Sequence, residues 1–136
     1  MNVSEIMTRD VKVVSSDDTL QHAAQMMEKC DVGAIPVSEN DRLVGMLTDR
    51  DIAIRAVARG LAPDTCMVKD IISSQVKYLY EDDSIEDAAR SMGSLQIRRL
   101  PVVSRDKRLV GIVSLGDLAV TNPVPAGEAL CSVSQD

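Results

Sequence analysis

The sequence predicts an α/β fold of the α+β type, made of two β-α-β-β-α repeats that pack on each other. The segment that begins at Val3 aligns without a gap to the segment that begins at Val68, 65 residues later. Each copy alternates short aliphatic runs with a helical apolar stripe. A single copy of about 60 residues would bury too little surface to be comfortably stable alone, so two copies are expected to pack together.

Composition narrows the class of protein. The chain has 136 residues, a net charge of −6 and only two aromatic side chains, both tyrosine. Nucleic acid and anionic membranes attract proteins with an excess of Lys and Arg. Because this chain has an excess of negative charge, neither is an expected partner. The N-terminus has no apolar signal region, and no apolar run approaches the roughly 20 residues that span a bilayer. We therefore expect a cytoplasmic protein.

Metal and disulfide chemistry are not expected either. The three cysteines have no CxxC spacing and cannot all pair within one chain. The single histidine, His22, has no neighbouring cysteine or second histidine in the sequence, and a lone helical histidine is typical of a protein surface. No metal site and no required cofactor are predicted.

The elements of each repeat follow the same order. The β-branched and aromatic runs Val11–Val14 and Val76–Tyr80 predict first strands. Asp18 and Asp83 then stand as expected N-caps of the first helices, with Gln or Glu three residues later. The apolar stripes of these helices are Leu20, Ala23, Ala24 and Met27 in one repeat, and Ile85, Ala88, Ala89 and Met92 in the other.

Two further strands and a second helix complete each repeat. The runs around Pro36 and Pro101 predict second strands, and turns at Asn40-Asp41 and Arg105-Asp106 lead into the third strands. Second helices are expected from Asp49 and from Leu115. The predicted boundaries are residues 1–61 for the first repeat, 66–121 for the second, and 122–136 for a tail with a short final helix. The stretch RGLAPDTC, residues 59–66, reads as the linker.

One motif occurs in both repeats where the third strand meets the second helix. LVGMLTDRDIA, residues 43–53, aligns with LVGIVSLGDLA, residues 109–119. What recurs is Gly, then Thr or Ser, then Asp. Thr48 with Asp51, and Ser114 with Asp117, suit an ordinary helix N-cap. The same geometry suits a ligand, because a helix N-terminus and a hydroxyl bind phosphate while a carboxylate accepts from both ribose hydroxyls.

These residues resemble the cystathionine-β-synthase (CBS) domain family, as a stand-alone tandem pair. The resemblance rests on GAIPV and RRLPVV, each followed by the motif above, and covers residues 3 to about 120. It implies a flat module with pseudo-two-fold symmetry and two clefts between the repeats. It also implies adenosine-containing ligands, with AMP, ADP or ATP ahead of S-adenosylmethionine and NAD, and a regulatory rather than catalytic role.

The resemblance further implies that each motif faces the other repeat. Thr48 and Asp51 would meet Ser73, Val76 and the Gln96–Leu100 segment, while Ser114 and Asp117 would meet Thr8, Val11 and the Val32–Pro36 segment. Arg98 and Arg99 stand where the first repeat has Gly33 and Ala34, so the arginines are phosphate candidates and the small residues leave room for a base. The alternatives are a solvated arginine pair and simple strand packing. Arg50 is a further candidate for phosphate binding, and its alternative is an exposed residue in the first turn of the helix. Ile35 and Ile97, at the strands, complete the set of candidates.

Two functions stay open from the sequence. One is a regulatory adenine-nucleotide-binding module that acts on an unknown protein partner in trans. The other is a ligand-free dimerisation or interaction protein that keeps the fold. The uncharged Leu115-Gly116 of the second motif keeps this hypothesis open for one cleft. No set of residues for an enzyme is recognisable. A homodimer is expected through the second helix, where Ile52, Ala53, Ala56 and Val57 form one apolar face while Ile54 and Ala58 lie off it.

Overall fold

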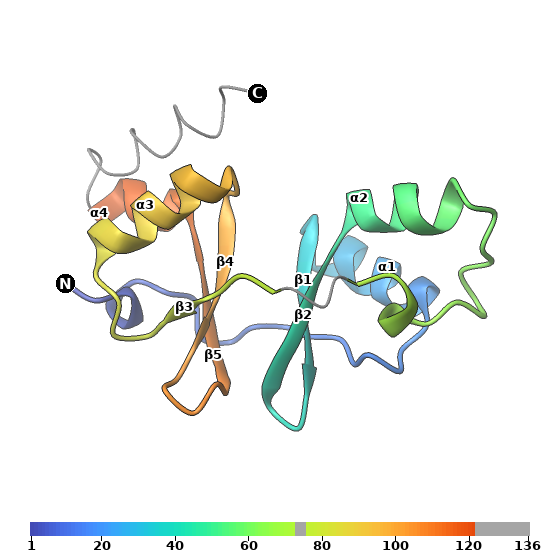
Figure 1. The fold of residues 1–136 in the computed structure, drawn as a ribbon, viewed down its shortest axis with the longest axis horizontal. Coiled ribbons are helices and arrows are strands. Elements are labelled where there is room, and N and C mark those ends of the chain that lie inside the picture. Colours follow the sequence, from blue (N-terminus) through green and yellow to red (C-terminus); the bar gives the residue numbers. More distant parts are fainter. Residues whose placement is uncertain (73–75, 122–136) are drawn as a thin grey trace. The chain divides into compact units, whose positions relative to one another are not determined.

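The structure is a computed structural model that describes residues 1–72 and 76–121, with Val120 and Thr121 described by their backbone alone. The chain forms two compact units (Figure 1). The first unit is Lys12–Val76, and the second joins Met1–Val11 to the described part of the chain from Lys77 onward. The predicted mixed fold of two repeats is confirmed, and the first residues of the chain pack with the second repeat. The short helix predicted within 122–136 lies outside the described residues.

The first unit holds one helix, a hairpin and a second, irregular helix. Its elements are α1 (Leu20–Cys30), β1 (Ala34–Glu39), β2 (Arg42–Thr48), α2 (Asp49–Asp51), the π-helical η2 (Ile52–Val57) and the 3₁₀ turn η3 (Val68–Asp70). β1 and β2 pair in antiparallel register across the predicted turn, where Asn40 and Asp41 both have positive φ. Two such residues in succession are typical of a tight hairpin turn.

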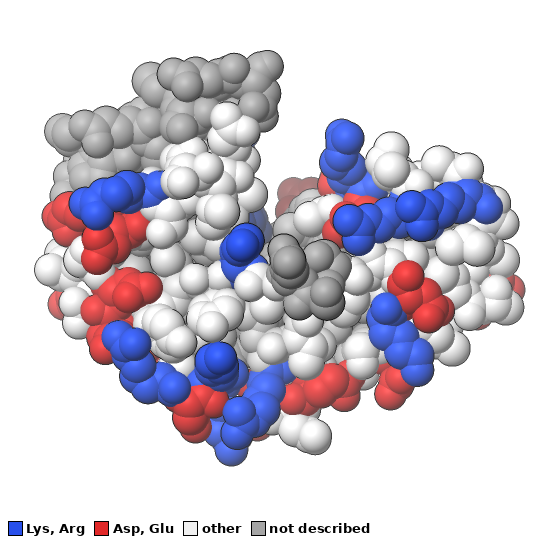
Figure 2. Space-filling model, in the orientation of Figure 1, with Lys and Arg blue, Asp and Glu red and all other residues white. Residues whose placement is uncertain are grey.

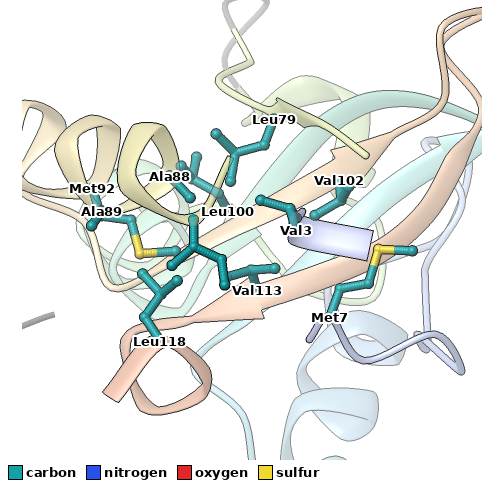
Figure 3. Close-up of a cluster of buried hydrophobic side chains, with 11 residues drawn as sticks. Val3, Met7, Leu79, Ala88, Ala89, Met92, Leu100, Val102, Val113 and Leu118 are labelled. Carbon is teal, nitrogen blue, oxygen red and sulfur yellow. The ribbon is translucent and has the colours of Figure 1, made fainter. Parts of the chain in front are cut away.

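The second unit repeats this order and adds one strand pairing. Its elements are η1 (Val3–Glu5), β3 (Leu79–Tyr80), α3 (Ile85–Leu95), β4 (Arg99–Val103), β5 (Leu109–Ser114) and α4 (Leu115–Thr121). β3 runs parallel to β4, and β4 runs antiparallel to β5. Side chains from the N-terminal segment, the sheet and both helices form its core (Figure 3). Both predicted second helices begin where expected, at Asp49 and Leu115.

The predicted first strands are shorter than expected. Val11–Val14 forms no strand, and Val14 makes only an isolated parallel bridge to Val37. In the second unit only Leu79 and Tyr80 pair. The two repeats diverge because the backbone N–H of Glu81 donates to the carbonyl of Val103 at 2.9 Å, whereas the matching N–H of Ser16 donates to the carboxylate of Glu39 at 2.8 Å.

The predicted helix caps are wrong by one residue. Thr19 and Ser84 cap α1 and α3, and their hydroxyl oxygens accept from the backbone N–H of His22 and Asp87 at 3.1 Å in both cases. Asp18 instead stabilises the turn that precedes the helix, because its carboxylate accepts from the backbone N–H of Ser15 at 2.8 Å.

The helical stripes match the core except at one residue. All four expected residues of α3 are buried, but Ala24 of α1 is exposed. The matching Ala89 shares a core cluster with Leu118 of α4, which is fully buried, whereas Ile52 at the equivalent place in the first unit is only partly buried. The second helix of the first unit, α2 with η2, therefore covers less of α1 than α4 covers of α3.

Gly111 allows the N-terminal segment to cross β5 closely. Thr8 and Ile112 exchange two backbone hydrogen bonds, of 2.9 and 3.0 Å. A Cβ atom at Gly111 would lie 2.6 Å from the sulfur of Met7 and 2.8 Å from the carbonyl oxygen of Thr8. No other residue type fits this crossing without a shift of the backbone.

Candidate functional site

The first motif lies where β2 ends and α2 begins. The hydroxyl oxygen of Thr48 accepts from the backbone N–H of Asp51 at 3.0 Å. In return, Oδ2 of Asp51 accepts from the N–H of Thr48, also at 3.0 Å. This reciprocal pair is a capping box, so the helix-cap interpretation of the motif is confirmed.

The second motif has the same geometry. The N–H of Asp117 donates to the hydroxyl oxygen of Ser114 at 3.2 Å, and the N–H of Ser114 donates to Oδ2 of Asp117 at 2.9 Å. All four motif residues are partly buried. Both repeats thus fix a hydroxyl and a carboxylate side by side at the end of a strand, and solvent still reaches them.

Gly33 and Ala34 lie beside the first motif within the first unit. Ala34 is the register partner of Thr48, and the carbonyl of Gly33 accepts from the N–H of Asp49 at 2.9 Å. A Cβ atom at Gly33 would lie 3.0 Å from a carboxylate oxygen of Asp49. Ile35 is buried in the core. The small residues therefore allow close strand packing, which was the alternative interpretation, and their expected role toward Ser114 and Asp117 stays a prediction.

Arg98 and Arg99 take the equivalent place beside the second motif. Arg99 is the register partner of Ser114, and the carbonyl of Arg98 accepts from the N–H of Leu115 at 3.0 Å. Both arginines are exposed at this strand end, while Ile97 packs against the core. The structure thus brings two cations to the strand end that carries Ser114 and Asp117.

The remaining candidates divide between the two units. Val76 belongs to the first unit with Thr48 and Asp51, and Arg50 is an exposed residue in the first turn of α2. Thr8 and Val11 belong to the second unit. Thr8 forms an isolated antiparallel bridge with Ile112, which lies two residues before Ser114. Ser73 lies outside the described residues. The expected meetings of each motif with the other repeat stay predictions.

The sequence reasoning missed one side chain next to the first motif. Arg55 places its Nε 4.0 Å from Oδ1 of Asp51, and its Nη1 donates to the carbonyl of Ile71 at 2.9 Å. The spacing of four residues from an acid to a base on a helix would have predicted the ion pair. The contact with Ile71, sixteen residues away in the chain, has no signal in the sequence.

A second missed cluster fixes the segment before α1. Oε1 of Glu39 accepts from the hydroxyls of Ser15 and Ser16, at 2.7 and 2.6 Å. The hydrogen bonds from the side chains of Ser16 and Ser15 lower the pKa of Glu39, with the Ser16 contribution the larger. Because these bonds favour the ionised carboxylate, the cluster is strongest when Glu39 is charged.

The two tyrosines interact with each other and with a cation. Their ring centroids are 5.5 Å apart at an interplanar angle of 87°, and the Arg105 guanidinium lies 4.3 Å above the Tyr80 ring. The hydrogen bond between the phenols lowers the pKa of Tyr78 and raises that of Tyr80.

Charge on the described surface is mixed. Lys69 pairs with Asp17 at 3.1 Å, and Arg105 pairs with Asp82 at 2.8 Å. Basic and acidic side chains are interspersed on the face drawn in Figure 2. Among the described residues, no group of three or more His, Cys, Asp or Glu is placed to hold a metal ion, and His22 is exposed near Asp18. Among the helices that the structure describes, none combines the length and the apolar character that a membrane-spanning segment needs.

Several proteins are similar to this chain over nearly its whole length. The CBS domain-containing protein YhcV of Bacillus subtilis is 46% identical over 135 residues, which cover 98% of this chain and 95% of that protein. Hypoxic response protein 1 of Mycobacterium tuberculosis is 41% identical, with 94% and 92% covered. Inosine-5'-monophosphate dehydrogenase of Methanocaldococcus jannaschii is 34% identical, and the match spans 23% of that enzyme and 89% of this chain.

Solved structures share the fold and include bound ligands. The crystal structure of Hypoxic Response Protein I with two coordinated zinc ions matches with a TM-score of 0.82 and 40% identity, covering 88% of this chain and 98% of that one. CBSX2 in complex with AMP matches at 0.77 and 25%, covering 90% and 96%. The CBS domain pair of MJ0100, in complex with 5'-methylthioadenosine and S-adenosyl-L-methionine, matches at 0.77 and 26%, covering 91% and 97%.

The family assignment rests on both repeats. The sequence model of the CBS domain matches residues 3–57 and again residues 68–120. These matches contain both capping boxes and both strand ends described above. The predicted resemblance is therefore confirmed, and the chain belongs to the CBS domain family, as a protein with two CBS domains.

Proposed function

We propose that this protein is a regulatory module that binds an adenosine-containing ligand, with AMP, ADP or ATP as the first candidates. The observation that carries the proposal is the repeated motif, in which a hydroxyl and a carboxylate are fixed in the same geometry at two strand ends. CBSX2 with AMP, and MJ0100 with S-adenosylmethionine, support an adenosine-type ligand in this family.

The cap and the ligand can use the same side chains. A hydroxyl has one donor and two acceptor positions, and the cap occupies one acceptor position of Thr48 or Ser114. The O–H of Thr48 can still donate to a phosphate oxygen. A carboxylate has two oxygens, and the capping box of Asp51 occupies Oδ2. Its Oδ1 is the oxygen that we assign to the ribose hydroxyls.

The exposed arginines favour a ligand that carries phosphate. Arg98 and Arg99 stand at the strand end next to Ser114 and present planar guanidinium groups that suit phosphate oxygens. Arg98→Ala together with Arg99→Ala should therefore weaken AMP more than adenosine, because only AMP supplies the anion. Equal losses for both ligands would show that the arginines do not bind phosphate.

A homodimer is part of the proposal. Three apolar side chains on or just after the second helix are exposed: Ile54 at 52%, Val57 at 67% and Leu61 at 42%. Exposed apolar side chains grouped in this way are typical of an interaction surface. The expected face is only partly correct, because Ile54 is exposed whereas Ala56 is buried within the unit.

The alternative function is a ligand-free dimerisation protein. It draws support from the capping boxes, which satisfy the backbone groups at both helix starts without any ligand. A regulated partner in trans is proposed for the ligand-binding function, and catalysis by this chain is proposed for neither. The CBS match inside the dehydrogenase above spans under a quarter of that enzyme, which fits an accessory role for the module.

Thermal melting against a ligand panel separates the two functions. A ligand that binds only the folded state stabilises it by about 2.7 kcal/mol at a hundred times its dissociation constant. AMP, ADP, ATP, NAD and S-adenosylmethionine should be tested at millimolar concentration, with inosine monophosphate as a control for the base. A rise in melting temperature with at least one adenine nucleotide is expected. No rise with any of them would favour the ligand-free function.

A further inference from the structure

Arg55 links the first motif to the core of its own unit. Its guanidinium lies between the Asp51 carboxylate, 4.0 Å from Nε, and the carbonyl of Ile71, 2.9 Å from Nη1. Ile71 is 3% exposed and belongs to the buried cluster of the first unit, so its carbonyl is a fixed acceptor. Ala56, the next residue after Arg55, is 2% exposed and anchors the helix in the same cluster.

The carboxylate of Asp51 is therefore held from two sides. The N–H of Thr48 donates to Oδ2, and Arg55 faces Oδ1. Oδ1 is the oxygen assigned above to the ribose. A carboxylate fixed in orientation before the ligand arrives loses less freedom on binding than one that must first be ordered. The planar fork of arginine suits this role, because it can engage two acceptors in a fixed arrangement.

We propose that Arg55 is a positioning residue, which orients the Asp51 carboxylate toward the ribose hydroxyls of the ligand; this inference rests on the proposed function. The matching position of the second repeat is Thr121, four residues after Asp117, which carries no charge.

The experiment measures the ratio of the dissociation constants for 2'-deoxy-AMP and AMP by titration calorimetry. Arg55→Met keeps the aliphatic stem and removes the guanidinium, and Arg55→Lys keeps the charge without the fork. Arg59→Met is the matched control, because Arg59 is exposed four residues further along. Arg55→Met should lower the ratio about two- to fivefold, the range for a partly exposed ion pair. Arg55→Lys should recover part of it, and Arg59→Met should leave it unchanged.

A double variant tests whether Arg55 acts through Asp51. In an Asp51→Ala background, Arg55→Met should cause no further change in the ratio, because the group that it orients is gone. An unchanged ratio in Arg55→Met, with AMP still bound, would overturn the inference and leave the proposed function intact. Arg55→Met could instead reduce the preference for AMP over adenosine while the ratio for 2'-deoxy-AMP and AMP stays constant. That result would assign Arg55 to phosphate binding and would also overturn the inference. If Arg55→Met does not fold, the Arg55→Lys ratio decides. Failure of the unmodified protein to bind AMP would overturn both proposals.

Discussion

Gly111→Ala should destabilise the protein by releasing the N-terminal segment from β5. The new Cβ atom would lie 2.8 Å from the carbonyl oxygen of Thr8 and 2.6 Å from the sulfur of Met7. The methionine end can move, but the carbonyl is backbone that exchanges two hydrogen bonds with Ile112. Forcing a methyl group into such a contact costs about 1–3 kcal/mol. The melting temperature should fall by about 3–6 °C for each kcal/mol.

A second glycine in the same unit supplies the control. A Cβ atom at Gly116, in α4, would meet only the hydroxyl of Ser114, at 3.5 Å. Gly116→Ala should therefore stabilise the protein by about 0.4–1 kcal/mol, because alanine has less backbone freedom than glycine to lose on folding.

Hydrogen exchange tells the proposed cause from a general loss of stability. In Gly111→Ala, the amides of Thr8 and Ile112 should exchange faster than those of α3, because their ladder is the part that opens. Equal melting temperatures for the two alanine variants would refute the reasoning. Uniform acceleration of exchange across the second unit would also refute it, because the N-terminal segment would then not be the site of the damage.

Two other consequences can be measured directly. Hydrogen bonding holds the pKa of Glu39 below its ordinary value of 4.5, so its stabilising effect is present above that pH and is lost as the pH falls through the folded-state pKa. Glu39→Gln should lower the melting temperature at pH 7, and its difference from the unmodified protein should disappear in acid. Glu28→Gln is the control, because Glu28 is exposed. A difference that stays constant at all pH values would contradict the stabilising role of the ionised Glu39. Val57→Asp should convert the proposed dimer to a monomer in light scattering, because it places a charge on the exposed apolar surface. Ala24→Asp, on the exposed side of α1, should leave the dimer intact, and dimers in both variants would exclude the second helix as the interface.

Local patterns predicted much of each repeat. The stripe of Ile85, Ala88, Ala89 and Met92 is buried as expected, because the period of a helix alone decides which residues share a face. The spacing from Thr48 to Asp51 predicted the capping box, since both partners lie within one turn. The hairpin at Asn40-Asp41 is equally local.

Contacts between distant residues account for what the sequence did not predict. Val11–Val14 has the composition of a strand, yet the Glu39 carboxylate takes the hydrogen bond that would have extended the ladder. The bond from Arg55 to Ile71 and the crossing of Met7 over Gly111 likewise join residues far apart in the chain. No periodicity marks such pairs, so only the folded structure shows them.

The central claim is that the repeated motif binds ligand as well as capping a helix. Calorimetric titration of AMP into Asp51→Ala and Asp117→Ala, with the melting temperature of each variant measured alongside, tests it most directly. A lost hydrogen bond to a charged group should weaken AMP binding about ten- to a hundredfold. The lost cap should cost about 0.5–2 kcal/mol of stability whether or not AMP is present. Variants that melt lower yet bind AMP as the unmodified protein does would contradict the account and leave both motifs as helix caps alone.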